Sequence, residues 1–361
     1  MDKIRFGLVG CGDIAHIRYF YSIPHYEEIE LVGIYDINKP FLQKTADELG
    51  VKAFNSYEEM LDDPTIQAVI VTTYHPSHTP LAIQALKAGK HVISEKPVSV
   101  SIEQAKELKQ AAAETDKIFM AMPNDAYPQI EKVKALIQQG AIGNVCAVDC
   151  VFAHHGPLHA PWFFDSKKAQ WGVLADLGVY SISTLSYLFG PISRVYGETR
   201  CFEKRRVSDA GEEFIPSVED NVAATFVWDD GKVATMRSNW CTGVHKSHGL
   251  WRFEFEGSEG MIHLDMARED HPIIVVSPNK EIPGAERVNF MGQDYCYSIK
   301  MDGNIDVNDS VLALFLDAIK NNRKFPDNGC SIVRQNHVIE VIDRIYQSSR
   351  TGKAYEITTK F

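Results

Sequence analysis

Short apolar runs alternate with segments of helical periodicity along the first third of the chain. The apolar runs that we interpret as strands lie at residues 4–9, 29–35, 67–71, 91–94 and 118–121. Between them, helical periodicity or capping residues predict helices at 15–23, 40–49, 81–88 and 101–115, and the capping-box spacing of residues 56–59 predicts the start of another short helix. Residues 72–78 are predicted to form a polar turn. Strands and helices in strict alternation predict a parallel, doubly wound α/β sheet of the Rossmann type.

The alternation ends near Pro123, where a different pattern begins. Helices are predicted at 130–139, 174–188, 308–321 and 331–348, and strands at 145–153, 191–202, 221–228, 233–240, 251–256 and 261–265. Tight-turn sequences between the strands favour an open, predominantly antiparallel sheet. We therefore predict an N-terminal Rossmann domain at 1–122 and an α+β domain at 123–361, with the C-terminal helices packing back on the first domain.

Composition narrows the classes of partner. The 361 residues are 45% hydrophobic and 24% charged, and the formal net charge is -11. Without a basic cluster, a nucleic-acid partner is not expected. No apolar run is long enough to cross a bilayer, and the first strand begins at Ile4, which leaves no room for a signal peptide. Seven scattered cysteines without a CxxC pair indicate reduced thiols in a cytoplasmic protein.

The first strand runs directly into a glycine turn that opens a helix. Gly10 would allow the tight turn, and Gly12 would let backbone amides approach a pyrophosphate, followed by Asp13 and Ile14. The helix N-terminus would then face the negative charge of the phosphates. Ala15 stands where a third glycine often occurs and is small enough for close packing. The pattern predicts a dinucleotide site, and a glycine turn without a ligand is the alternative.

The second strand ends at Asp36, whose carboxylate can accept hydrogen bonds from ribose hydroxyls and would repel a 2′-phosphate. No arginine follows closely, so we predict NAD as the cofactor in preference to NADP. Loops at the carboxyl ends of the strands would line the cofactor cleft. The predicted cofactor-binding residues are Gly10, Gly12, Asp13, Ile14, Asp36, Thr73, His78, Glu95, Pro97 and Asn124.

A lysine follows the strand at 91–94 in the sequence Glu95-Lys96-Pro97. A buried lysine at a strand end, close to a cationic nicotinamide, can have its pKa lowered into a catalytically useful range. The alternative interpretation is a surface lysine that pairs with Glu95.

The segment Ala88-Gly89-Lys90-His91-Val92-Ile93-Ser94-Glu95-Lys96-Pro97 resembles the AGKHVxxEKP signature of the Gfo/Idh/MocA oxidoreductase family, and the resemblance covers nearly the whole chain. It implies that Lys96 lies in the active site and that Glu95 and Pro97 help to hold the nicotinamide riboside. Two departures stand out. Tyr74-His75 replaces the usual Pro-Asn, and Asn124-Asp125-Ala126-Tyr127 replaces Asn-x-Arg-Phe, which suggests different substrate contacts.

A loop at 154–162 contains three histidines and Trp162. It favours a polar pocket with an aromatic wall for a sugar ring, and we take His154, Trp162 and Tyr127 as candidate substrate-binding residues. Metal ligation by the histidines and a solvated surface loop are the alternatives, and we predict no metal site. His245 and His248 lie in a later loop that carries no specific signal.

The helix at 174–188 has an apolar face and a polar stripe. Asp176, Tyr180, Ser183 and Tyr187 share the stripe, which would make sense facing a polar substrate in a cleft. The alternative is that Tyr180 is a packed core residue and Asp176 is solvated. Where many members of the resembled family carry an acid/base histidine, this chain has Tyr180, as in the glucose-fructose oxidoreductase and dihydrodiol dehydrogenase branches.

These features together predict an NAD-dependent oxidoreductase that acts on a secondary alcohol of a sugar, cyclitol or related polyol. Tyr180 would transfer the hydroxyl proton, Lys96 would lower the pKa of the phenol and stabilise oxyanion charge, and Asp176 would orient the substrate or the lysine. An NAD-retaining glycosidase or lyase and a non-catalytic cofactor-sensing regulator are the alternatives. The resemblance also implies a homodimer or homotetramer, assembled through one face of the C-terminal sheet.

Overall fold

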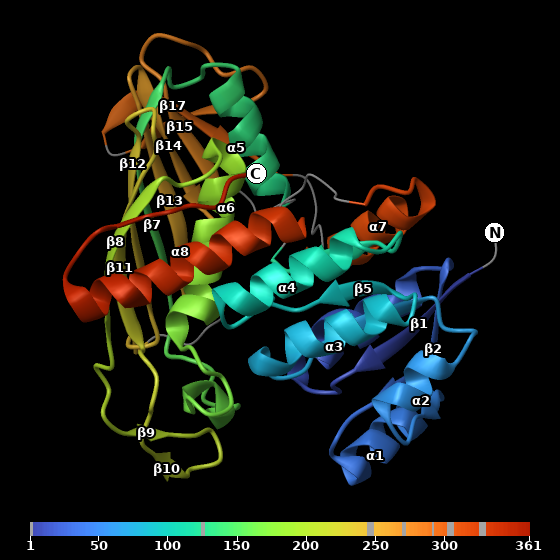
Figure 1. Cartoon of the computed structure of the whole chain (residues 1–361). Coiled ribbons are helices and arrows are strands. Elements are labelled where there is room, and N and C mark those ends of the chain that lie inside the picture. The colour runs from blue at the N-terminus through green and yellow to red at the C-terminus, as the bar shows by residue number, and fades with distance from the viewer. Residues whose placement is uncertain are drawn as a thin grey trace. The chain divides into compact units, whose positions relative to one another are not determined.

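The computed structural model describes residues 3–123, 127–243, 249–268, 272–290, 292–301, 307–324 and 330–361. The chain divides into two compact units, shown with their elements labelled in Figure 1. Unit 1 comprises Met1–Asn124 and Ile305–Ile339, and unit 2 comprises Asp125–Asn304 and Glu340–Phe361. None of the helices in the described part of the chain has the length and apolar character needed to traverse a bilayer.

Unit 1 is built on a six-stranded sheet in which every pair of neighbours is parallel. The spatial order is β3-β2-β1-β4-β5-β6. The strands are β1 (Ile4–Val9), β2 (Ile29–Tyr35), β3 (Lys52–Ala53), β4 (Ala68–Val71), β5 (His91–Ser94) and β6 (Phe119–Ala121). The predicted doubly wound Rossmann sheet is confirmed. Only the two-residue strand β3 is absent from the sequence prediction, because it is too short to show a pattern.

Helices connect these strands. They are the π-helix η1 (Ala15–Phe20), the 3-10 helix η2 (Ile23–His25), α1 (Lys39–Leu49), α2 (Tyr57–Asp62), α3 (His75–Lys87) and α4 (Ile102–Ala113). Side-chain oxygens of Asn38, Ser56 and Ser101 accept N–H groups in the first turns of α1, α2 and α4. These caps satisfy amides that lack an intrahelical partner, which explains why the predicted starts of these helices are accurate.

The prediction was wrong for the start of α3. The polar segment that we expected to form a turn through His78 becomes helical at His75, so His78 lies on the helix. Pro76 occupies the first turn, where a missing N–H costs nothing, and Pro80 is tolerated inside the helix. Two prolines and several polar residues made this first turn look like a loop.

The core of unit 1 joins segments from opposite ends of the chain. Helix α7 (Val307–Lys320) contributes Val311, Leu312 and Phe315 to the apolar cluster that contains Phe6 of β1. The rings of Phe6 and Phe315 meet edge to face with centroids 6.0 Å apart, and both side chains are fully buried. Burial of such aromatic surface is the main stabilising contribution at this position.

Unit 2 contains a ten-stranded sheet in the order β16-β17-β15-β14-β13-β7-β12-β11-β8-β18. Its strands are β7 (Val145–Ala153), β8 (Arg194–Arg200), β11 (Asn221–Val227), β12 (Val233–Asn239), β13 (Leu250–Gly257), β14 (Gly260–Asp265), β15 (Ile273–Val276), β16 (Glu286–Phe290), β17 (Gln293–Ile299) and β18 (Tyr355–Glu356). Among the described strands of this sheet, only β7 and β12 pair in parallel, so the predicted, predominantly antiparallel sheet is confirmed. Strands β15 to β18 were not predicted.

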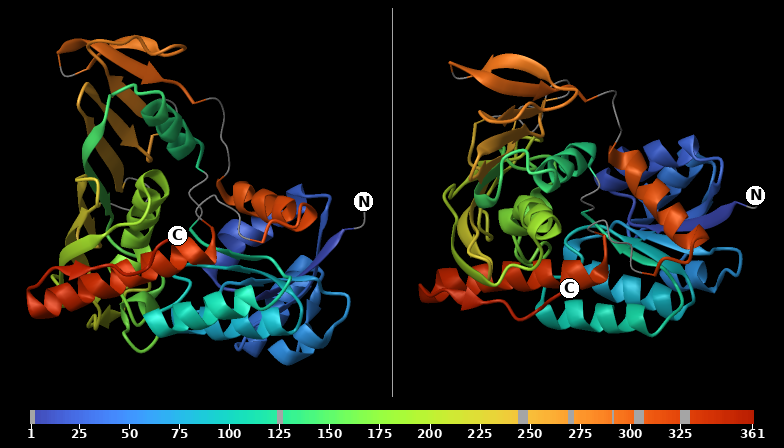
Figure 2. Two further views of the ribbon diagram at one scale, coloured as in Figure 1. Left: turned by 45° about the horizontal axis from the view of Figure 1, so that its top comes forward. Right: turned by 90° about the horizontal axis from the view of Figure 1, so that it is seen from above.

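Helices cover one face of this sheet. Figures 1 and 2 show α5 (Pro128–Gln138) and α6 (Val179–Phe189) on the same side of it. The π-helix η4 (Leu174–Gly178) leads into α6, and the 3-10 helix η3 (Pro161–Phe164) lies in the preceding loop. A small hairpin, β9 (Arg206–Val207) and β10 (Glu213–Phe214), stands apart from the large sheet. Helix α8 (Ile332–Thr351) begins in unit 1 and ends in unit 2.

The sheet of unit 1 contains a histidine whose ionisation opposes folding. Burial, with a smaller contribution from Lys117, lowers the pKa of His91 to about 4, and the Ile118 N–H donates to its Nδ1 at 2.9 Å. A histidine pKa below that of the unfolded chain, about 6.5, means that the unfolded state binds more protons between these values. The contribution of neutral His91 to stability is therefore complete above pH 6.5 and lost as the pH falls towards 4.

We predict that His91→Asn, whose amide oxygen can accept the Ile118 N–H, makes the free energy of unfolding fall less steeply between pH 6.5 and 4 than in the wild type. Urea titrations at closely spaced pH values measure this slope. Identical slopes in the two proteins would show that His91 is not the titrating group. Other acid-sensitive groups are the same in both proteins and cancel in the comparison.

Candidate active site

The turn after β1 requires glycine at its first position. Gly10 has φ +93°, and a Cβ there would lie 2.8 Å from the carbonyl carbon and oxygen of Thr72. The Thr72 hydroxyl donates to the Gly10 carbonyl oxygen at 2.5 Å, which ties this turn to the end of β4. At Gly12 the added Cβ would meet no atom of the described chain within 4 Å. The space beside Gly12 therefore remains open for a ligand at the N-terminus of the following helix.

Asp36 is oriented by the backbone at the end of β2. Its two carboxylate oxygens accept the Cys11 N–H and the Asn38 N–H, both at 2.8 Å. This places a fixed carboxylate beside the glycine turn, as ribose recognition requires. Burial, and then the charge of Asp36, raise the pKa of the Cys11 thiol to about 12, so the neighbouring cysteine is an unreactive thiol.

Glu95 forms a buried ionic network directly before Lys96. One of its oxygens accepts hydrogen bonds from Arg18 Nη1 at 2.5 Å and from the Tyr19 hydroxyl at 2.9 Å, and the other accepts the Lys96 N–H at 3.3 Å. Arg18 and Glu95 are 7% and 3% exposed. Burial alone would raise the pKa of Glu95, but the nearby charges of Arg18 and Lys96 lower it below its ordinary value. The carboxylate is therefore ionised and holds the strand end that carries Lys96 against η1.

His78 joins the two loops that follow β4 and β5. Its Nδ1 lies 2.8 Å from the Pro97 carbonyl oxygen, and its Nε2 lies 2.8 Å from that of Thr73. The ring is 1% exposed, and burial lowers its pKa. His78 therefore positions Thr73 and Pro97 relative to each other.

One buried polar atom in unit 1 fits a dinucleotide ligand. The Thr73 hydroxyl oxygen is shielded from solvent and makes no hydrogen bond within the described part of the chain. Buried polar groups are normally satisfied, and an exception calls for an explanation such as a ligand. Together with the open space at Gly12 and the oriented Asp36 carboxylate, this observation shows that the residues present fit the predicted NAD.

In unit 2, Tyr180 belongs to a group of aromatic side chains. Its ring meets Phe152 and Trp251 at steep angles, with centroids 5.8 Å and 5.5 Å away, and Phe152 stacks on Trp251 at 4.6 Å. The Tyr127 ring also meets Trp251 edge to face, with centroids 5.5 Å apart. Tyr180 is only half-buried, so the structure does not place it in the packed interior. The Trp251 indole nitrogen is shielded from solvent and makes no hydrogen bond among the described residues.

Phe152 and Trp251 are residues that our sequence reasoning missed. They face each other across the antiparallel pair of β7 and β13, in direct register. The signal was present as two aromatic residues in two strands that were both predicted for the second domain. It could be used only once the register was known, because a shift of one residue turns a side chain to the other face.

Asp176 lies on the π-helix η4 and is 7% exposed, so it is not a solvated first-turn residue. Its N–H and that of Ala175 donate to the Gly172 carbonyl oxygen, both at 3.2 Å. Tyr180 follows four residues later. A π-helical segment inserted before a helix is found frequently at functional sites.

The far end of the predicted polar stripe does not face a substrate. The Tyr187 hydroxyl donates to Glu131 of α5, and the Lys134 ammonium group lies 3.7 Å from the centre of the Tyr187 ring. Ser183 is fully buried. The stripe prediction was wrong for Tyr187, because a second helix, α5, supplies the acceptor of its hydroxyl.

The histidine loop is shaped by its backbone. The Gly156 N–H donates to His154 Nδ1 at 2.9 Å, and the His154 ring meets Phe152 edge to face at 6.1 Å. His154 is therefore close to the aromatic group of Tyr180, while Trp162 stacks on Phe163 at 3.9 Å. No set of three histidine, cysteine, aspartate or glutamate side chains in the described ranges is arranged to hold a metal ion.

Asn124, His245 and His248, which the sequence analysis named, lie outside the described residues. Lys96 belongs to unit 1, whereas Asp176, Tyr180, Tyr127, His154 and Trp162 belong to unit 2. The candidate site therefore consists of two sets of residues, each held by its own unit.

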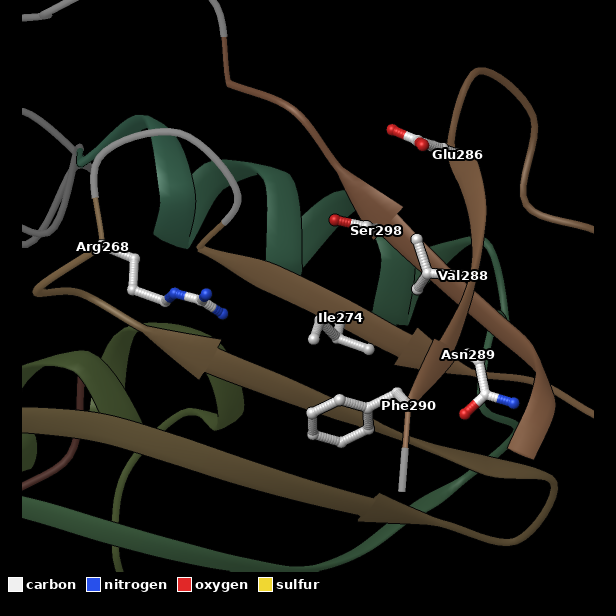
Figure 3. Close-up of a pocket in the computed structure, with 7 residues that line it drawn as sticks. All are labelled: Arg268, Ile274, Glu286, Val288, Asn289, Phe290 and Ser298. Carbon is white, nitrogen blue, oxygen red and sulfur yellow. The ribbon is translucent and has the colours of Figure 1, made fainter. Parts of the chain in front are cut away.

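A separate hollow of about 500 Å³ lies near the β16 edge of the large sheet. Its lining residues are Arg268, Ile274, Glu286, Val288, Asn289, Phe290 and Ser298. Figure 3 shows Ile274 and Phe290 close together and the Glu286 carboxylate turned away from them. None of the predicted site residues lines this hollow, so we do not assign the chemistry to it.

Comparisons with known proteins show which family has these two domains. Residues 4–122 match the model of an oxidoreductase family with an NAD-binding Rossmann fold, and residues 130–263 match that of the GFO/IDH/MocA C-terminal domain. The chain is 26% identical to mouse trans-1,2-dihydrobenzene-1,2-diol dehydrogenase, over 81% of this chain and 82% of that protein. It is 31% identical to glucose-6-phosphate 3-dehydrogenase of Bacillus subtilis (strain 168), over 52% and 54% of the two chains.

The fold is shared with levoglucosan dehydrogenase, solved in complex with NADH and L-sorbose. That structure matches with a TM-score of 0.82 at 20% identity and covers 99% of each chain. At this identity, the match shows the shared fold.

The buried pair in unit 1 leads to a stability prediction. Arg18→Met would leave the Glu95 charge buried without its main partner, so we expect a loss of about 3–5 kcal/mol in the free energy of unfolding. The double variant Arg18→Met/Glu95→Gln should recover most of this loss. Arg5→Met, which breaks the exposed pair of Arg5 and Glu30, is the control and should cost less than about 1 kcal/mol. Urea unfolding at pH 7 measures all three, and equal losses for the two single variants would contradict the interpretation.

Proposed function

Because the chain belongs to the Gfo/Idh/MocA family of NAD-binding oxidoreductases, we propose that it transfers a hydride between NAD and a secondary alcohol of a sugar, cyclitol or related polyol. The observation that carries this proposal is the placement of Tyr180. A phenol that is half-buried among Phe152 and Trp251, one helical turn after the buried Asp176, is suited to exchange a proton with a bound alcohol. The names of two relatives, a dihydrodiol dehydrogenase and a glucose-6-phosphate 3-dehydrogenase, support this substrate class.

NAD, when bound, supplies the hydride acceptor. In our proposal Gly10, Gly12 and the adjoining helix start hold its pyrophosphate, Asp36 binds the ribose hydroxyls, and Thr73 donates or accepts a hydrogen bond at the open position of its hydroxyl. Asp13, Ile14, Pro97 and Asn124 complete the proposed cofactor contacts. Glu95 and His78 contribute by fixing the two loops rather than by direct contact.

The proton chemistry is assigned to three residues. Tyr180 takes the hydroxyl proton during oxidation and returns it during reduction. Lys96 favours the phenolate and stabilises the developing oxyanion through its positive charge. Asp176 orients the substrate hydroxyl, and Tyr127, His154 and Trp162 are proposed to contact the rest of the substrate. The stacked rings of Phe152 and Trp251 offer an apolar face beside these polar groups.

We further propose that the protein is cytoplasmic and forms a homo-oligomer through the sheet face that α5 and α6 leave uncovered. The absence of a disulfide among the seven cysteines, all of which are described, supports the first point. Buried and exposed residues alternate along β11 and β12, so one face of these strands is exposed. Val233 of β12 is 42% exposed, and Tyr196 of the adjoining strand β8 is 45% exposed. Light scattering of the purified chain at micromolar concentration should give a multiple of 40.5 kDa, whereas a monomer mass would refute the assembly.

Two variants test the catalytic assignment. We predict that Lys96→Ala and Tyr180→Phe each lower kcat by at least about 100-fold on a polyol found by screening for NADH absorbance, because each removes a group that acts on the transferred proton. The Kd for NAD should change less than about threefold, as measured by protein fluorescence. Tyr187→Phe is the matched control, since it removes a phenol hydroxyl from the same helix but one that pairs with Glu131.

The same assay separates the alternatives. Turnover without net NADH release, with NAD remaining on the protein, would identify an NAD-retaining glycosidase or lyase. NAD binding without oxidation of any sugar or polyol in the library would favour a cofactor-sensing regulator. Unchanged kcat in both Lys96→Ala and Tyr180→Phe would disprove the proton-transfer assignment.

A further inference from the structure

A carboxylate outside the candidate site controls the start of the segment that carries Asp176 and Tyr180. Neither η4 nor α6 has a side-chain cap of its own. Instead, Glu219 comes from the residues just before β11 and accepts the Gly172 N–H at both carboxylate oxygens, at 3.0 Å and 3.1 Å. It also accepts the Leu174 N–H at 3.1 Å. The Val173 N–H donates to the backbone carbonyl oxygen of Glu219 at 3.2 Å.

Three successive amides therefore converge on one residue. The first amides of a helical segment have no intrahelical acceptor, so a carboxylate there satisfies several donors at once and interacts favourably with the helix dipole. The fourth donor is the Tyr346 hydroxyl of α8, at 2.6 Å from the carboxylate, and the Tyr346 ring stacks on Trp171 with centroids 5.6 Å apart. The Tyr346 hydroxyl shares Oε1 with the Gly172 and Leu174 amides, so a side chain of α8 also helps to fix the orientation of the carboxylate.

Gly172 transmits this contact to the candidate catalytic residues. A Cβ at position 172 would lie 2.1 Å from the Glu219 carbonyl oxygen and 3.0 Å from its carboxyl carbon, so the close approach requires glycine. The Gly172 carbonyl oxygen accepts the N–H groups of Ala175 and Asp176. One hydrogen bond therefore separates the residue that Glu219 holds from the backbone of Asp176.

We propose that Glu219 is a positioning residue of the dehydrogenase, which fixes Asp176 and Tyr180 for proton transfer by clamping the amides of residues 172 to 174. This inference rests on the proposed function for the roles of Asp176 and Tyr180. Glu219 touches neither substrate nor cofactor in this scheme. It acts by setting where η4 begins, and a displacement of about 1 Å in a reacting group can cost about 100-fold in rate.

The chain offers a matched control for a clamp of the same chemistry. Glu340, 2% exposed and also in unit 2, accepts the N–H groups of Thr358 and Thr359 at 2.7–3.2 Å and the Thr358 hydroxyl at 2.7 Å. It holds the C-terminal segment instead of the helix with Asp176. A general loss of stability from removing a backbone-binding carboxylate should therefore appear in Glu340→Ala as well as in Glu219→Ala.

The experiment compares Glu219→Ala, Glu219→Gln and Glu340→Ala in the full-length, NAD-loaded protein. Hydrogen exchange followed by mass spectrometry should show at least about tenfold faster exchange in the peptide containing residues 172–180 for Glu219→Ala, and no change there for Glu340→Ala. With a polyol substrate, Glu219→Ala should lower kcat about 100-fold with an unchanged KM for NAD. Glu219→Gln keeps one acceptor oxygen, so its kcat should be about tenfold higher than that of Glu219→Ala.

Unchanged exchange at residues 172–180 in Glu219→Ala would overturn the clamp. Faster exchange with an unchanged kcat would overturn the positioning role while leaving the dehydrogenase assignment intact. An equal kcat loss in Glu340→Ala would also overturn it, because general destabilisation would then suffice. The exchange measurement needs no substrate, so failure to find any oxidisable polyol would count against the proposed function and not against the clamp.

Discussion

The organisation of the nucleotide-binding unit depends on a charge that is kept out of water. Glu95 is almost fully buried, and its ionised form persists because Arg18, Tyr19 and the Lys96 amide all direct donors at it. An isolated carboxylate in this environment would be strongly unfavourable, so the pairing constrains η1 and the end of β5 to one relative position. The glycine turn before η1 and the lysine after β5 are consequently fixed with respect to each other within unit 1.

In unit 2, acidic residues also fix neighbouring segments of the chain relative to each other. Glu219 holds the start of η4, and the next residue, Asp220, is fully buried and forms an ion pair with the largely buried Arg206 at 2.9 Å. Arg206 in turn donates to the carbonyl oxygens of His155 and Trp240. Two consecutive carboxylates before β11 therefore hold both the helix with Asp176 and the loop with the histidines. The proposed chemistry needs few residues, but their placement depends on these buried polar contacts, whose geometry tolerates little change.

Local patterns predicted most elements of the fold because each has a local cause. The strands of unit 1 are short apolar runs, and α1, α2 and α4 begin at capping residues and can be found without knowledge of the rest. The start of α3 was missed because prolines in a first turn resemble a loop. Strands β16 and β17 mix polar with apolar residues and β18 has only two residues, whereas β15 was missed although Ile273–Val276 is a clear apolar run. For the proposed site, Gly10 and Asp36 were suggested by their spacing and strand position, and Lys96 by the family signature around it. Phe152, Trp251 and Glu219 were not, since each acts through a residue distant in sequence.

By itself, the sequence predicted the fold class and the NAD cofactor, since these follow from periodicity and from glycine and carboxylate positions, and a contiguous signature led to the proposed reactive side chains. Only the tertiary structure decided which of these polar residues have partners within the chain. It shows His78 and Glu95 buried and hydrogen-bonded to neighbouring residues, places Tyr187 against Glu131 and brings Phe152 and Trp251 beside Tyr180. The physical reason is that burial and hydrogen-bond partners depend on strand register and helix packing, which join residues far apart along the chain.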